Sequence, residues 1–294
     1  PGTRTSSLGP LEHLVGTWTN QDNPVTKRGG TDTPYSYNVM PLPQAGSYIL
    51  KNFGYYEIIT FSAIHGDAPN RGGLGTQVAN TIFYEQRIYF AEGPDKDKLV
   101  HAENGSWLYL TDRGQYEGPY GTTPLPSSGI PTQKFNLAKQ ISVPHGNSIL
   151  AEGTFQTANS TLTIPDLQGV VPSVAGLDVS QYQTKSVGNP NPEYTANPNL
   201  PLIDSLTASP VTDYIHLNID SNNGGPHPVT NIGFEQKHAK VTRYYGDYWL
   251  EKANGSSSYN QLQYSQTIRM DVPINDVGTV SFPHVTTNTL TKIS

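Results

Sequence analysis

The chain contains no cysteine, which excludes disulfides, zinc–thiolate sites, cysteine nucleophiles and cysteine-ligated haem. Charge is also scarce: charged residues make up 14% of the 294 residues, against roughly 25% in ordinary soluble domains. The 18 Lys and Arg residues are outnumbered by 24 Asp and Glu, giving a net charge of −6, so we expect no nucleic-acid partner. No apolar run approaches the roughly 18 residues of a membrane helix, so we expect no membrane partner either. No signal peptide is visible in Pro1–Leu11.

Residues that favour strands and turns are plentiful, with 28 Gly, 24 Pro and 18 Tyr. Strand composition bounded by turn residues predicts strands, after a short helical turn within Leu11–Thr19 that runs into a first strand. The expected strands are Ser47–Phe53, Tyr55–Ile64, Thr81–Phe90, His101–Leu110, Ile141–Phe155, Ser160–Ile164, His227–Phe234, Ala239–Leu250, Tyr259–Val272 and Thr279–Ile293. Residues 1–10 are expected to form a loose arm.

Strands at both ends of the chain, without alternating helices, favour a closed antiparallel sheet. We therefore expect an all-β fold, an antiparallel up-and-down β-barrel of the lipocalin or calycin type with about ten strands. It forms a single domain over residues 1–294, with long loop insertions at about 111–135 and 165–230. A barrel of eight or more strands can enclose one small ligand.

Three segments resemble the nitrobindin family of haem-binding β-barrels, and together they cover about half of the chain. The first contains Gly16-Thr17-Trp18, similar to the Trp that plugs the closed end of lipocalin-like barrels. The second is the series YYEIITFS, FYEQRIYF and LVHAENGSW, in the family's order. The third is TIRM followed by FPHVTTNTL at the C-terminus, which resembles the family's Pro-His-x-x-x-x-Leu ending.

The resemblance implies that His284, in the C-terminal block, ligates the iron of haem b. A neutral imidazole suits that role, and Pro283 fixes the backbone beside it. His145 and His101 are the candidate catalytic residues, because a second imidazole could donate a hydrogen bond to a bound oxygen species or move a proton. The candidate haem-contacting residues are His284, Met270, Val143, His101, Ile149 and Phe61.

Acidic residues recur on neighbouring expected strands. His101 and Glu103 share one face of a strand, since residues i and i+2 do. Either they form a buried polar pair with Arg87, or His101 faces the haem, and both can hold together. Glu57, Glu85 and Glu103 could be glycosidase carboxylates, but an ion-pair ladder with Arg87 is the favoured interpretation. No nucleophile elbow, His-Glu-x-x-His motif or phosphate-binding Gly-rich loop is present.

The resemblance implies a haem b enzyme that acts on reactive nitrogen or oxygen species through a His-ligated ferric iron, by binding nitric oxide and isomerising peroxynitrite. One alternative is a peroxidase-like enzyme acting on peroxide. In it, residues 165–230 fold over the haem and bring Tyr214 or His227 to an enclosed pocket. For His227, a solvated loop position is the favoured interpretation. Another is a non-catalytic carrier of haem or another apolar ligand. We expect a monomer or homodimer. The glycosylation tripeptides at Asn104, Asn159 and Asn254 favour an extracytoplasmic location.

Overall fold

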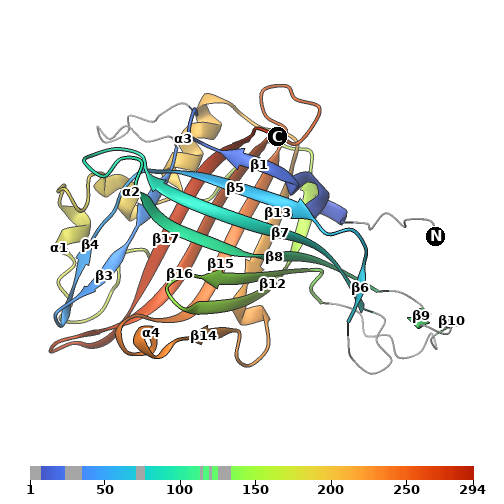
Figure 1. The fold of residues 1–294 in the computed structure, drawn as a ribbon. Coiled ribbons are helices and arrows are strands. Elements are labelled where there is room, and N and C mark those ends of the chain that lie inside the picture. Colours follow the sequence, from blue (N-terminus) through green and yellow to red (C-terminus); the bar gives the residue numbers. More distant parts are fainter. Residues whose placement is uncertain (1–7, 24–34, 71–76, 113–114, 119–120, 125–133) are drawn as a thin grey trace.

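Ten antiparallel strands close into a barrel in the computed structural model, which describes residues 8–23, 35–70, 77–112, 115–118, 121–124 and 134–294 (Figure 1). In order around the barrel they are β1 (Gly16–Thr19), β5 (Tyr55–Ala63), β7 (Gln77–Phe90), β8 (Leu99–Asp112), β11 (Leu137–Val143), β12 (Asn147–Ala158), β13 (Tyr214–Asp220), β15 (Lys240–Glu251), β16 (Gln261–Ile274) and β17 (Gly278–Lys292). The ring closes where Trp18 of β1 pairs with Lys292 of β17. The predicted all-β barrel of about ten strands is confirmed.

Shorter elements surround this barrel. The remaining strands are β2 (Tyr37–Val39), which pairs with β17, β6 (Ala68–Pro69), β14 (Val229–Asn231), and the two-stranded sheets β3 (Pro41–Gln44) with β4 (Ser47–Leu50) and β9 (Gln115–Gly118) with β10 (Gly121–Pro124). The helices are η1 (Gly9–Leu14), η3 (Ser221–Asn223), α1 (Ser180–Gln183), α2 (Pro192–Ala196), α3 (Leu200–Ala208) and α4 (Gly233–His238). The predicted turn before the first strand is η1.

One end of the barrel is closed by the N-terminal segment. Leu11 and Leu14 of η1 are buried, and the indole Nε1 of the fully buried Trp18 donates a hydrogen bond of 2.7 Å to the carbonyl of Leu14. Gly9 adopts a φ of +55°, and its Cα lies so close to the Tyr109 ring that a Cβ would clash. The hairpins β7–β8, β11–β12 and β16–β17 lie at the opposite end, which we call the mouth.

Three expectations about the middle of the chain are wrong. The expected single strand Ile141–Phe155 is a hairpin, β11 and β12, because Gly146 has a φ of +99° and turns the chain. Ser160–Ile164 forms no strand, since its apolar side chains pack into a cluster outside the barrel. The expected strand His227–Phe234 is limited to Val229–Asn231, and α4 begins directly afterwards.

The expected insertion at 165–230 contains β13, a strand of the barrel itself. Tyr214 begins β13 opposite Glu251, at the closed end, so it cannot reach the mouth as proposed from sequence. His227 is exposed, between η3 and β14. The helical part of the segment packs outside the barrel, where α3 contacts β17 (Figure 1). The expected arm at 1–10 and the insertion at 111–135 lie largely outside the described residues.

Candidate functional site

Side chains deep in the barrel interior are buried, and some nearer the mouth are partly exposed. Side chains that lie opposite each other on paired strands point to the same face, and the even-numbered positions Leu262, Tyr264 and Leu290 of β16 and β17 pack in the core of the barrel. Nearer the β16–β17 turn, Val280 and Phe282 pack instead in a second apolar cluster with Tyr48 of β4. Deep positions such as Leu262 and Leu290 are buried. Nearer the mouth, Ile268, Met270 and His284 are all partly exposed.

Three histidines gather at this mouth. His284 of β17 lies opposite Ile268, His101 of β8 lies opposite Ile88, and His145 lies in the β11–β12 turn. The rings of His101 and His145 are 5.6 Å apart between centroids. Burial, together with the charges that His101 and His145 carry when protonated, lowers the pKa of His284 to about 4. His284 is therefore a neutral imidazole at physiological pH, the form that binds a metal.

Asn38 of β2 contacts the ring of His284. The two side chains share one face, because Asn38 pairs with Thr286, two residues from His284. The Oδ1 atom of Asn38 lies 2.7 Å from Nε2 of His284. With the oxygen as acceptor, Nε2 carries the proton and Nδ1 carries the lone pair. A metal can bind through Nε2 only if this contact with Asn38 is released.

Glu103 connects the histidines to the interior. Its Oε2 atom lies 3.1 Å from Nε2 of His101, and its Oε1 atom accepts a hydrogen bond of 2.7 Å from the hydroxyl of Tyr84. Burial raises the pKa of Glu103, but the hydrogen bond from His101 and the charge of Lys139 outweigh burial, so the pKa lies below its usual value. Burial and the charge of His101 lower the pKa of His145.

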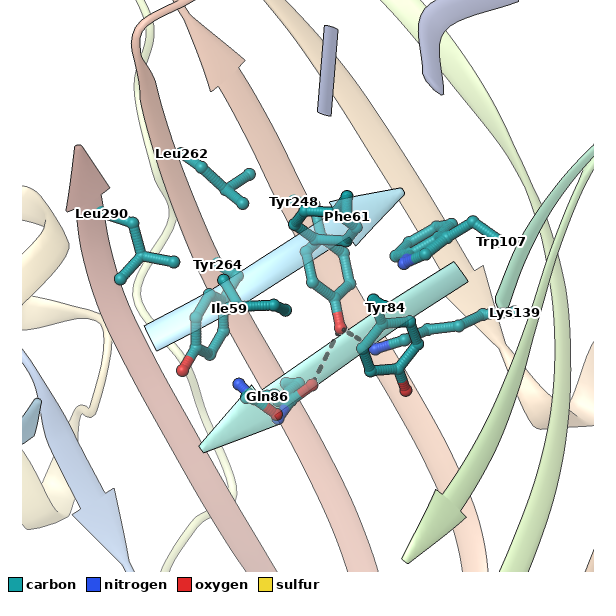
Figure 2. Close-up of a pocket in the computed structure, with 11 residues that line it drawn as sticks. Ile59, Phe61, Tyr84, Gln86, Trp107, Lys139, Tyr248, Leu262, Tyr264 and Leu290 are labelled. Atoms are coloured by element: carbon teal, nitrogen blue, oxygen red, sulfur yellow. Dashed lines mark hydrogen bonds between the residues drawn. The ribbon is translucent and has the colours of Figure 1, made fainter. Parts of the chain in front are cut away.

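A small cavity of about 20 Å³ lies deeper in the barrel, beside the buried Lys139 (Figure 2). The Nζ atom of Lys139 donates hydrogen bonds of 3.0 Å and 2.9 Å to the hydroxyls of Tyr244 and Tyr248. It also lies 5.0 to 5.3 Å from the centroids of four rings, a cation–π cage. The four rings are those of Tyr84, Trp107, Tyr244 and Tyr248. The cavity has room for one water molecule, whereas small-molecule pockets span roughly 300–1,000 Å³.

Glu57 forms a second polar group in the interior. It is fully buried and accepts hydrogen bonds from Gln86, Tyr264 and Asn288, the last at 2.9 Å. Burial raises the pKa of Glu57 in spite of these donors. The carboxylates therefore divide between two faces: Glu57 and Glu103 point inward, while Glu85 and Arg87 form an exposed ion pair outside. The expected ladder of all four residues, and the expected contact of Arg87 with His101, are wrong.

The structure brings most of the predicted site residues to one place and separates one of them. His284, His101, His145, Met270 and Val143 lie at the mouth end of their strands or turns, and Ile149 follows on the inner face of β12. Phe61 instead lines the deep cavity with Tyr84 and Trp107.

Sequence reasoning missed Lys139, Tyr84 and Asn38. A usable signal existed for Lys139, because it occupies the inward-facing position in the alternating strand LAKQISV.

The described residues contain no group of three or more His, Asp or Glu side chains that could hold a metal ion by themselves. The donor set instead suits one axial bond to the iron of a haem: a single neutral imidazole that is partly accessible, with the thioether Met270 nearby. The deep cavity is too small for the macrocycle, and Lys139 and Glu57 fill the interior with polar groups. The deep interior therefore does not fit a haem, and at the mouth His284 is the residue that would hold one.

In comparisons with known proteins, no family model matches the chain, and no curated protein matches it. The fold therefore defines its class, an all-β, lipocalin-like closed barrel with a histidine-lined mouth. Among the described residues, no helix has the length and apolar character needed to cross a membrane.

Proposed function

We propose that the protein binds haem b at the mouth of the barrel, where His284 would bind the iron. The observation that carries this proposal is a neutral, inward-facing and partly exposed imidazole close to two further histidines. A bound ferric haem would supply the iron chemistry for binding nitric oxide and converting peroxynitrite to nitrate. The residues of this chain would bind the haem, orient its ligand and supply or accept protons.

Each residue of the mouth has a distinct part in this proposal. His284 presents its lone pair once Asn38 releases or reorients the ring. Met270, Val143 and Ile149 supply apolar contact, which limits the access of water to a reactive ligand. His101 and His145 hold or move a proton, since their rings lie together and His145 is exposed to the incoming ligand. Phe61 lines the deep cavity and therefore does not contact the haem directly in this proposal.

A peroxidase-like activity is the second candidate, and the His101–Glu103 pair favours it. Cleavage of a peroxide requires a proton to move from one oxygen to the other, which a carboxylate-held imidazole can carry out. A carrier of haem or another apolar ligand would need the open mouth but not this pair. Decay of peroxynitrite, turnover of a phenol with peroxide, and haem retention without either activity distinguish the three functions.

The test of the haem proposal is a hemin titration followed by the Soret band. Wild-type protein is expected to shift the band with a one-to-one end point, and His284→Ala is expected to lose the His-ligated spectrum and most of the affinity. His216→Ala is the matched control, because His216 lies on β13 and stacks on Trp249 outside the barrel. Equal spectra for wild type and His284→Ala, with both proteins folded by circular dichroism, contradict the proposal.

A further inference from the structure

Glu103 is the one carboxylate that contacts both the histidine pair at the mouth and the polar interior of the described barrel. Both of its oxygens have a hydrogen-bond partner, His101 on one side and Tyr84 on the other. Its side chain is only 6% exposed, while that of His101 is 20% exposed. The buried carboxylate is thus fixed behind an imidazole that solvent and ligands can reach.

This geometry determines which nitrogen of His101 carries the proton. An ionised carboxylate only accepts hydrogen bonds, so Nε2 of His101 must be the donor. Neutral His101 then carries its lone pair on Nδ1, the nitrogen that Glu103 leaves free. Carboxylates orient catalytic and metal-binding imidazoles in the same way in many enzymes, by holding one tautomer and one ring orientation.

Other charged groups around the pair come from four elements. Lys139 on β11 favours the ionised form of Glu103, and the carboxyl of Glu57 on β5 lies close enough for Glu103 to raise its pKa. His145 in the β11–β12 turn and His284 on β17 both feel the charge of His101. Tyr84 on β7 holds the carboxylate in place, so the acceptor of the His101 proton does not depend on solvent.

We propose that Glu103 is the positioning residue of the site: it holds His101 in the Nε2–H tautomer, with Nδ1 available to take up or deliver a proton at the mouth. The catalytic consequence rests on the proposed haem function. The tautomer itself does not, because it depends only on the contacts of Glu103 with His101 and Tyr84.

The first measurement therefore uses the haem-free protein. Nitrogen-15 NMR of the histidine side chains is expected to show His101 as a single Nε2–H tautomer at neutral pH. In Glu103→Gln the new amide can donate as well as accept, so the Nδ1–H tautomer is expected to become populated. Glu85→Gln, which removes an exposed carboxylate on the outer face of the barrel, is expected to leave the His101 signals unchanged. A wild-type His101 in the Nδ1–H tautomer overturns the proposal.

The second measurement uses the haem-loaded protein and separates binding from reactivity. Glu103→Gln is expected to retain its Soret band and haem affinity but to react with peroxynitrite or peroxide 10- to 100-fold more slowly, the usual range for the loss of an orienting partner. Tyr84→Phe keeps the carboxylate charge and is expected to give a smaller loss of the same kind. Wild-type rates in both variants overturn the catalytic claim.

The two proposals fail in different ways. If no haem binds, the proposed function fails, and the NMR result still decides the role of Glu103. If haem binds to His284 but the tautomer of His101 does not depend on Glu103, only the positioning role is wrong. If Glu103→Gln does not fold, the wild-type tautomer and the rates of Tyr84→Phe decide the proposal.

Discussion

Lys139 is a buried ammonium whose charge balances that of Glu103. Replacing Lys139 by Met removes the cation that favours the ionised form of the buried Glu103, together with two hydrogen bonds to tyrosine hydroxyls. We expect Lys139→Met to lower the free energy of unfolding by about 3–5 kcal/mol, measured by urea denaturation. The double variant Lys139→Met/Glu103→Gln is expected to recover about 0.5–3 kcal/mol relative to the sum of the single changes. Strict additivity would show that the two charges do not interact.

At the scale of single residues, sequence reasoning works where strand alternation alone decides. The pairing of His101 with Glu103 follows from their i, i+2 spacing. The assignment of Glu57 and Glu85 to one face fails, because register between strands decides it: Glu57 lies opposite Ile88, which places Glu85 on the other face. Register depends on the turn between the strands and on packing in the closed barrel, which composition does not reveal.

The first strand closes the barrel, and Trp18 is the side chain that fixes it to the N-terminal turn. Trp18 is fully buried, and its indole donates to the carbonyl of Leu14. We expect Trp18→Ala to cost about 3–5 kcal/mol of stability, because it leaves a large cavity at the closed end. Trp18→Phe keeps most of the packing, so it is expected to cost less stability than Trp18→Ala. Its cost is that of the smaller lost volume plus about 1 kcal/mol for the lost hydrogen bond.

Urea denaturation of both variants, followed by tyrosine fluorescence and far-ultraviolet circular dichroism, measures these costs. A loss for Trp18→Ala below that of Trp18→Phe would mean that the N-terminal turn does not close the barrel. Hemin affinity should change little in either variant, since Trp18 lies at the end opposite the mouth.

At the scale of elements, the long strands with strong alternation could be predicted from the sequence, whereas the short strand β13 and the exact ends of β11 and β12 could not. β15, β16 and β17 follow from their Tyr-, Ile- and Thr-rich runs. β13 was missed because it lies inside a segment rich in Pro, Asn and Ser, where its short apolar alternation resembles a loop. The turn-like residues Val143-Pro144-His145-Gly146 were recognisable, but the expected strand ran across them because the residues on both sides are strand formers. The mouth histidines meet only through these non-local pairings.

For the whole molecule, two groups with shifted pKa values, the partly exposed His284 and the buried Glu251, make the stability depend on pH in opposite directions. His284 has a folded-state pKa of about 4, below its ordinary 6.5, so its contribution is present above pH 6.5 and is lost as the pH falls towards 4. Glu251, fully buried at the closed-end terminus of β15, has a folded-state pKa of about 8, raised from 4.5 by burial. Its contribution is present below pH 4.5 and is lost as the pH rises through 8. Between about pH 4.5 and 6.5, His284 makes the stability rise with pH while Glu251 makes it fall. Above pH 6.5 only the effect of Glu251 remains.

Substitution of Glu251 separates its effect on the pH dependence of stability from the effects of the other groups. Relative to Glu251→Gln, the wild type is expected to lose roughly 1 kcal/mol of stability per pH unit between pH 4.5 and 8, and nothing further above pH 8, because over this range the carboxyl is ionised in the unfolded chain but stays protonated in the folded protein. Gln261, which donates to one oxygen of Glu251, can donate equally to the amide of the variant. Urea midpoints of wild type, Glu251→Gln and the exposed control Glu85→Gln, taken from pH 5 to 9, measure this difference. A difference in stability between wild type and Glu251→Gln that does not change with pH would mean that Glu251 is ionised in the folded protein. Water or a cation would then have to reach its carboxylate.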